Sequence, residues 1–199
     1  MVKVGFIVEG DSEKVLIESA GFKKWASDQG LEICSPVINA KGGGNLLPHH
    51  IKPMLAQIER SQPDHIVILT DLEDATDVEA VKARITTEQT ELIFIAVKAL
   101  EAWFLADTDA MRRWLNAPDF FEPTPEQTPE MPWDRLKEVA KVCGSRGPGS
   151  NKVIFAKKMC GVVLQYELER AAAHPACPSA KDFRDGLLKL SGNTPPLQG

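Results

Sequence analysis

Strand-length apolar runs alternate with helix-length amphipathic segments over the first 115 residues, and this alternation restricts the fold more than any other feature. The predicted strands cover residues 2–8, 31–38, 65–70 and 91–97. They are rich in valine and isoleucine, and helices are predicted near them at about 13–27, 46–60, 76–88 and 100–115. Such an order predicts an α/β fold, a TOPRIM/Rossmann-like, mainly parallel sheet of about four strands with helices on both faces.

The remainder of the chain differs in character. Residues 117–132 contain five prolines and several acids and are predicted to form a linker. Helices are predicted at 133–143, 151–173 and 179–190. We therefore expect an α/β domain at 1–116, a proline-rich linker at 117–132, and an all-helical C-terminal region at 133–199 that packs on the first domain.

Composition narrows the functional classes. The chain has 199 residues and a formal net charge of −5, which argues against a general nucleic-acid coat protein but leaves nucleic-acid enzymes open. Four widely separated cysteines lack C-x-x-C spacing, so a zinc site has no support. No apolar run approaches ~20 residues and no signal-peptide pattern is seen. We expect a cytoplasmic protein that does not contact membranes.

Ionisable residues follow three of the predicted strands. Glu9 follows the first, Asp71 and Glu73 follow the third, and Lys98 follows the fourth. Parallel strands end at one edge of the sheet, so these groups are expected to converge there. Clustered carboxylates repel one another, and a hard divalent cation removes that cost. An oxygen-only donor set favours Mg²⁺ or Mn²⁺.

The predicted helix at 100–115 supplies one further candidate ligand. Glu101 lies near the end of the fourth strand, whereas Asp107 is six residues later and projects from nearly the opposite side of an ideal helix. Glu101 is therefore the better candidate for a metal role. Trp103, Phe104 and Leu105 are interpreted as core residues.

A basic, glycine-rich stretch precedes the predicted helix at 151–173. Arg146, Lys152 and Lys157 could hold phosphates, and backbone N–H groups at a helix start favour anions. The alternative is a solvated basic helix face behind a flexible segment. The stretch does not contain the P-loop pattern.

Three motifs in this order resemble a known family. Val8-Glu9-Gly10-Asp11-Ser12-Glu13 is similar to the opening of TOPRIM-like domains, and Asp71-Leu72-Glu73-Asp74 stands where these domains carry a D-x-D motif. The stretch from Glu101 to Asp107, E-A-W-F-L-A-D, resembles a motif of a small stand-alone bacterial family, a TOPRIM-like domain of unknown function related to the OLD-type nucleases.

The resemblance implies roles for individual residues. Glu9 would be a metal ligand or general acid/base, and Asp71 the leading acid of the pair. The second acid is Glu73 here, giving D-x-E and a shifted geometry. Glu13 would bind an additional metal ion, and Lys98 would stabilise the transition state.

The leading functional hypothesis is metal-dependent phosphodiester hydrolysis, that is, a TOPRIM-type nuclease acting on DNA or RNA in phage defence or nucleic-acid processing. One alternative is a non-catalytic or ATPase-gated effector subunit of a bacterial defence system, in which an ATPase is the protein partner. Another is a phosphoaspartate receiver-like domain, although the fifth βα unit of such a domain is missing.

Overall fold

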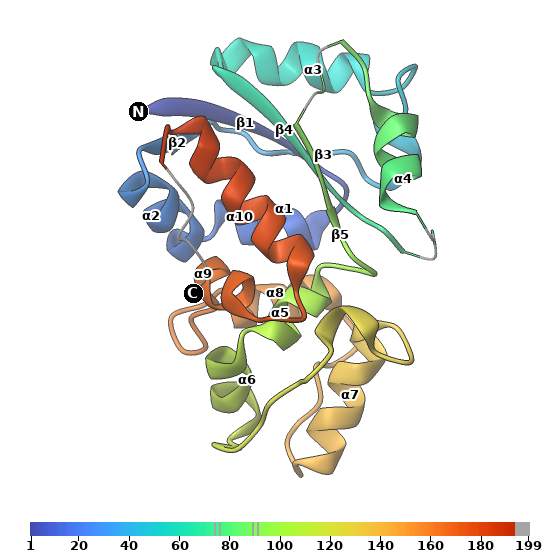
Figure 1. Cartoon of the computed structure of the whole chain (residues 1–199), viewed down its shortest axis with the longest axis vertical. Coiled ribbons are helices and arrows are strands. Elements are labelled where there is room, and N and C mark those ends of the chain that lie inside the picture. Colours follow the sequence, from blue (N-terminus) through green and yellow to red (C-terminus); the bar gives the residue numbers. More distant parts are fainter. Residues whose placement is uncertain (74, 76, 89, 91, 194–199) are drawn as a thin grey trace.

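The computed structural model describes residues 1–193 except 74, 76, 89 and 91. It is an α/β structure built on a parallel sheet, as predicted (Figure 1). The strand order is β2-β1-β4-β5, and β3 also pairs with β1. The strands are β1 (Val2–Val8), β2 (Leu31–Ile33), β3 (Ile38–Asn39), β4 (His65–Asp71) and β5 (Leu92–Ala96).

The second strand differs from the prediction. A single strand was expected at 31–38, but the chain forms β2 and β3, with a bend at Ser35 and Pro36 between them. β2 pairs with residues 2–4 of β1 and β3 with residues 7–8. Both therefore lie along the edge of β1 that β4 leaves free.

Helices surround the sheet and form a separate lower part in Figure 1. The α-helices are α1 (Asp11–Glu18), α2 (Ala20–Asp28), α3 (Lys52–Ile58), α4 (Val78–Ile85), α5 (Glu101–Ala106), α6 (Thr108–Leu115), α7 (Pro132–Val142), α8 (Lys152–Met159), α9 (Leu168–Ala173) and α10 (Pro178–Leu190). Short 3-10 helices cover Gly43–Leu46, Glu59–Ser61 and Pro125–Gln127. No described helix is long and apolar enough to cross a membrane.

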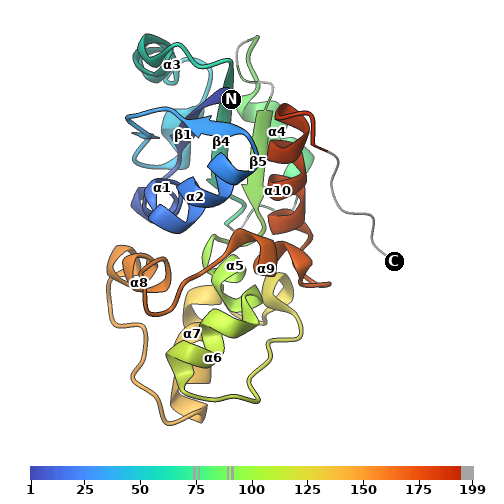
Figure 2. The ribbon, with the colours of Figure 1, turned by 90° about the vertical axis from the view of Figure 1, so that its left-hand side faces the viewer.

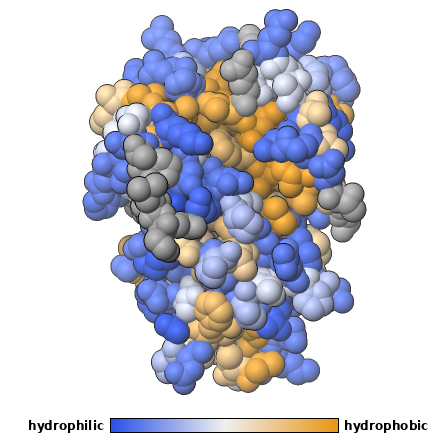
Figure 3. Space-filling model, in the orientation of Figure 1, coloured by the Kyte–Doolittle hydropathy of each residue, from blue (hydrophilic) through white to orange (hydrophobic). Residues whose placement is uncertain are grey.

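Alternate residues of the central strands supply two hydrophobic clusters. Phe6 and Val8 face the larger cluster, which continues through α1, α5, α8 and α10, whereas Ile7 faces the smaller one beneath α3 and α4. This is the period of two expected for a strand buried on both faces. Figure 3 shows apolar side chains gathered in the upper part of one face of the molecule, where α3 and α4 flank the sheet.

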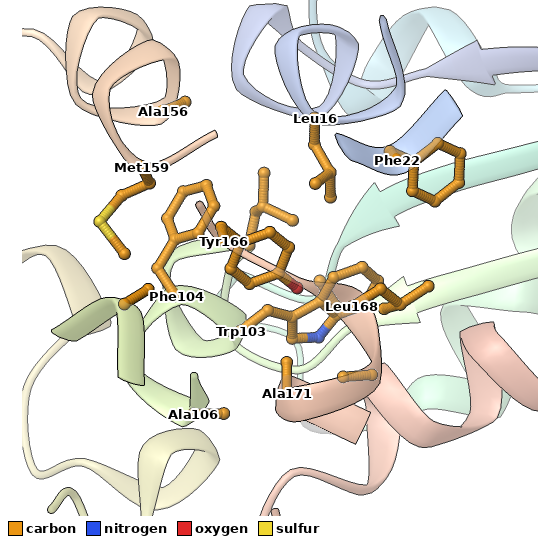
Figure 4. Close-up of a cluster of buried hydrophobic side chains, with 14 of the residues drawn as sticks. Leu16, Phe22, Trp103, Phe104, Ala106, Ala156, Met159, Tyr166, Leu168 and Ala171 are labelled. Carbon is orange, nitrogen blue, oxygen red and sulfur yellow. The ribbon is translucent and has the colours of Figure 1, made fainter. Parts of the chain in front are cut away.

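The helix that begins at Glu101 is the centre of the larger cluster. Trp103, Phe104 and Leu105 have no exposed surface, which confirms their prediction as core residues. Phe104 meets the ring of Tyr166 edge-on at 5.1 Å between centroids. In Figure 4 the side chains of α5 lie between Leu16 of α1 and the helices of the C-terminal region.

The segment predicted as a linker is packed against its surroundings. The buried Glu122 accepts a hydrogen bond at 2.7 Å from Arg135 of α7. Glu126 accepts one at 2.9 Å from the backbone N–H of Ser179 in α10, and burial raises its pKa. The C-terminal helices pack on the sheet through α10, which lies along β5 (Figure 2).

Candidate functional site

A hollow of about 350 Å³ lies at the carboxyl edge of the sheet, and acidic side chains from four elements line it. Glu9 directly follows β1, Glu13 is on α1, Asp71 ends β4, and Glu101 begins α5. The parallel sheet brings these distant residues to one edge, as the strand ends predict. The other residues that line the hollow are Gly10, Asp11, Ser12, Asn39, Lys41, Gly42, Lys152 and Val153.

Glu9 is held by neighbours on both sides. Its Oε1 accepts a hydrogen bond at 3.1 Å from the backbone N–H of Gly43, and its Oε2 accepts one at 3.1 Å from that of Asp71. The hydroxyl of Thr70 donates a further hydrogen bond to Oε2. These donors fix the orientation of the carboxylate, so Glu9 is preorganised beside Asp71.

Asp71 is half-buried at the end of β4 and is the second carboxylate of the site. Its Oδ1 accepts a hydrogen bond at 2.9 Å from the backbone N–H of Leu100. Burial raises the pKa of Asp71 well above its usual range, and the charges of Glu13, Glu101 and Glu9 raise it further. The carboxylate form is therefore costly unless a cation compensates it.

Glu13 is only 4% exposed although it lies in the first turn of α1. Burial raises its pKa to about 7, with further contributions from the charges of Glu101 and Glu9. Gly10 gives the side chain room, since a Cβ there would lie 3.0 Å from Oε2 of Glu13. The glycine of the opening motif thus lets Glu13 approach the sheet edge.

Glu101 is 2% exposed and, among the described residues, is the only one of these four acids that forms an ion pair, with Nζ of Lys152 at 3.2 Å. Lys152 is the first residue of α8, so this helix begins at the hollow. The site consequently has two sides. Carboxylates line the sheet side, and the start of a helix with a lysine lines the opposite side.

Several predicted site residues lie outside this hollow. Glu73 is exposed, has a φ of +50°, and lines an adjoining hollow of about 190 Å³ that Glu9, Asp71 and Arg84 also line. Arg146 and Lys157 are exposed and do not line the acidic hollow. Asp74 of the D-L-E-D motif is outside the described residues.

Lys98 also lies apart from the acids. Its ammonium group donates hydrogen bonds to the backbone carbonyls of Thr128 and of Glu130, the latter at 3.0 Å. Lys98 thus holds the segment at 117–132 rather than facing Asp71. Lys152 is the predicted cation that the structure does place beside the acids.

Two contributors to the site were not predicted from the sequence. Gly43 belongs to a loop that reads as flexible, yet its N–H meets Glu9, and a Cβ there would lie 3.2 Å from Oε1. Thr70 precedes Asp71 and donates to Glu9. The available signal was three consecutive glycines, which allow a backbone N–H to approach a carboxylate closely.

The carboxylate oxygens of the four acids are the kind of ligand that a hard divalent cation prefers. Their side chains do not converge on a single position. Within the described residues, no three acidic, histidine or cysteine side chains converge closely enough to hold a metal ion. All four acids nevertheless offer oxygen ligands to one hollow, and two have raised pKa values. Oxygen-only surroundings suit Mg²⁺ or Mn²⁺.

Comparison with known proteins identifies the family. Neither the curated proteins nor the solved structures contain a match to this chain. A family profile described as a domain of unknown function, DUF4276, matches residues 8–188. This range includes every acid of the hollow and extends from the end of β1 into α10. The chain therefore belongs to the DUF4276 family of domains of unknown function.

Proposed function

We propose that the chain is a metal-dependent phosphodiesterase that uses Mg²⁺ or Mn²⁺ and acts on DNA or RNA. The observation that carries the proposal is the acidic hollow, in which burial and mutual repulsion raise the pKa values of Glu13 and Asp71. A protein that keeps such a cluster at the carboxyl edge of a parallel sheet bears a cost that a divalent cation relieves.

Glu9, Glu13, Asp71 and Glu101 are the side chains that would hold the cation. Bound Mg²⁺ or Mn²⁺ supplies a more acidic water and neutralises charge on a reacting phosphoryl group. Glu9 is oriented in advance by Gly43, Thr70 and the backbone of Asp71. The resemblance of the three motifs to TOPRIM-like domains supports the same reaction class.

A cation on the opposite side of the hollow favours a phosphate-bearing substrate. Lys152, the first residue of α8, lines the hollow there. Arg146 and Lys157 are exposed on the same stretch as Lys152 and could bind neighbouring phosphates of a longer nucleic acid.

The four cysteines are free thiols, in agreement with the cytoplasmic location that we propose.

Cleavage of end-labelled oligonucleotides tests the proposal. We expect the purified chain to cleave single- or double-stranded DNA or RNA with Mn²⁺ and to lose activity with EDTA. Asp71→Asn and Glu9→Gln should each lower the rate at least about a hundredfold, because each removes a carboxylate charge from the site. Glu32→Gln, at an exposed acid on β2, is the matched control and should leave the rate unchanged.

A second candidate is an effector whose site is completed by an ATPase partner. It is favoured by the spacing of the acids, since among the residues that the structure describes no three such side chains converge on one metal position. In that case Asp71 would be needed for Mn²⁺ binding, but cleavage would require the partner and ATP. No such observation favours a receiver-like domain, because the ammonium group of Lys98 binds loop carbonyls instead of facing Asp71. Full activity of Asp71→Asn would overturn both candidates.

A further inference from the structure

We propose that Lys152 is an internal counterion that competes with the divalent cation for Glu101 and transfers to the substrate phosphate, so that metal and phosphate bind cooperatively. This inference rests on the proposed function, because it concerns the same hollow. It adds a regulatory property that the acids alone do not provide.

The contact between Lys152 and Glu101 is unequal in burial. Glu101 is almost fully buried, whereas the side chain of Lys152 is 46% exposed. A buried carboxylate needs a positive partner, but an exposed ammonium group is also stable in water. Lys152 can therefore leave at little cost to itself, provided that another cation replaces it at Glu101.

The position of Lys152 in its helix makes this contact less favourable still. Lys152 begins α8, where the helix dipole and the free N–H groups disfavour a positive charge and favour an anion. Asn151 satisfies one of these N–H groups by accepting a hydrogen bond at 3.1 Å from that of Ile154. A phosphate at the hollow would meet the lysine and the helix start together.

The rest of the acid cluster explains why the lysine is needed. Glu13 is buried, lines the same hollow and forms no ion pair with any of the described residues, although backbone hydrogen bonds at Glu13 and Gly10 reach it. The ammonium group of Lys152 balances one negative charge of the cluster, so without a metal it occupies a ligand that the metal requires. By linkage, a phosphate that attracts Lys152 then strengthens metal binding, and the metal strengthens phosphate binding.

Mn²⁺ binding, measured by electron paramagnetic resonance of the free ion, tests the competition without relying on activity. Lys152→Met should tighten Mn²⁺ binding about five- to twentyfold, a coupling of typical size. Lys41→Met is the matched control, since Lys41 lines the same hollow and forms no ion pair with any described residue. It should change the dissociation constant less than twofold.

Sulfate, which resembles a phosphate group, tests the cooperativity. At constant ionic strength, sulfate should tighten Mn²⁺ binding several-fold in the unsubstituted chain and have no effect in Lys152→Met. Equal effects in both proteins, or a Lys152→Met dissociation constant equal to that of Lys41→Met, would overturn the inference.

The two proposals fail in distinguishable ways. If Asp71→Asn abolishes Mn²⁺ binding but Lys152→Met behaves like Lys41→Met, the metal site stands and the role of Lys152 is rejected. If the unsubstituted chain binds no Mn²⁺ at millimolar concentration, both are rejected. Circular dichroism checks that Lys152→Met is folded, because the substitution leaves the buried Glu101 without its positive partner.

Discussion

At the scale of single residues, the site contains two carboxylates whose negative charges differ in how well the surrounding protein compensates them. Glu9 accepts hydrogen bonds from two backbone N–H groups and a hydroxyl, which compensate its charge. Glu13 is more deeply buried, and backbone hydrogen bonds at Glu13 and Gly10 compensate its charge only in part, so its pKa is raised to about 7. Glu9 is therefore oriented in advance as a ligand, whereas the charge of Glu13 lowers the stability of the protein unless a cation is bound.

Glu13→Gln should therefore stabilise the metal-free protein in a pH-dependent way. A carboxyl group with a raised folded-state pKa costs nothing when protonated below its unfolded value, and its penalty grows as the pH rises toward about 7. At pH 8 we expect the variant to gain on the order of 1–3 kcal/mol in free energy of unfolding, and almost nothing near pH 4.5.

Urea denaturation in EDTA at both pH values measures this difference. Glu32→Gln on the exposed side of β2 should show no difference between the two pH values. A stabilisation of Glu13→Gln that is equal at pH 4.5 and pH 8, or a loss of stability at pH 8, would contradict the assigned burial cost.

The sequence located the ionisable residues that strands and helix starts position, and it could not locate those that lie in turns. The parallel order of strands predicted Glu9, Asp71 and Glu101 at this edge, whereas the role of Glu13 was implied by the family resemblance. Glu73 and Lys98 have φ values of +50° and +61°, and the N–H of Glu73 donates to the carbonyl of Lys98 at 2.8 Å. Such local backbone conformations turn side chains away from the direction that strand periodicity indicates.

At the scale of elements, polar residues divide predicted helices into shorter ones. Ser19 separates α1 from α2 and accepts a hydrogen bond from the N–H of Phe22. Asp107 separates α5 from α6, accepts from the N–H of Ala110 and binds Arg170 at 2.7 Å. Apolar periodicity continues across both positions, so it predicts a single helix where a cap begins a second one.

The same limitation applies to α8 and α9, predicted as one helix at 151–173. The chain leaves the helical path at Cys160 and Gly161, and Leu164 and Tyr166 are buried before α9 begins. Arg113 of α6 stabilises this connection by donating to the carbonyl of Leu164 at 2.9 Å. The break depends on a contact with a residue about fifty positions earlier, which local sequence does not reveal.

Lys98→Met tests the role that the structure gives to the segment at 117–132. Loss of the two carbonyl contacts should increase amide hydrogen exchange in this segment several-fold, because its backbone loses a fixed donor. Mn²⁺ binding at the acidic hollow should change less than twofold. Lys137→Met, at an exposed lysine paired with Asp134, is the control and should leave the exchange unchanged.

The opposite pattern would support the catalytic role predicted for Lys98 from the family resemblance. In that case hydrogen exchange at 117–132 would stay as in the unsubstituted chain, whereas oligonucleotide cleavage would be lost. The two readouts therefore separate a residue that holds the loop from one that acts on the substrate.

At the scale of the whole molecule, the acidic hollow depends on the packing between the sheet and the C-terminal helices. The larger hydrophobic cluster runs from β1 through α5 to α10, and it places α8 opposite the carboxyl edge of the strands. In Figure 2, α8 and α10 lie on different sides of the molecule, although they are close in sequence. A displacement of the helical region from the sheet would remove Lys152 and Val153 from the hollow.

The contact between α10 and β5 is close enough to test this dependence. Gly186 lies inside α10, and a Cβ at this position would be 2.2 Å from Cζ of Phe94 on β5. Alanine in a helix interior is usually better than glycine by about 1 kcal/mol. Here the clash should dominate, so Gly186→Ala should lower the free energy of unfolding by about 1–3 kcal/mol.

Gly21→Ala in α2 is the matched control, because its Cβ would meet only the carbonyl of Tyr166 at 3.7 Å, an ordinary contact. It should stabilise the protein by up to about 1 kcal/mol. Phe94→Leu removes the edge of the ring, so Gly186→Ala should become neutral or favourable in that background, as a urea double-mutant cycle would show. If Gly186→Ala stabilises the unmodified chain as Gly21→Ala does, α10 does not approach β5 this closely, and the placement of the helical region over the site loses its support.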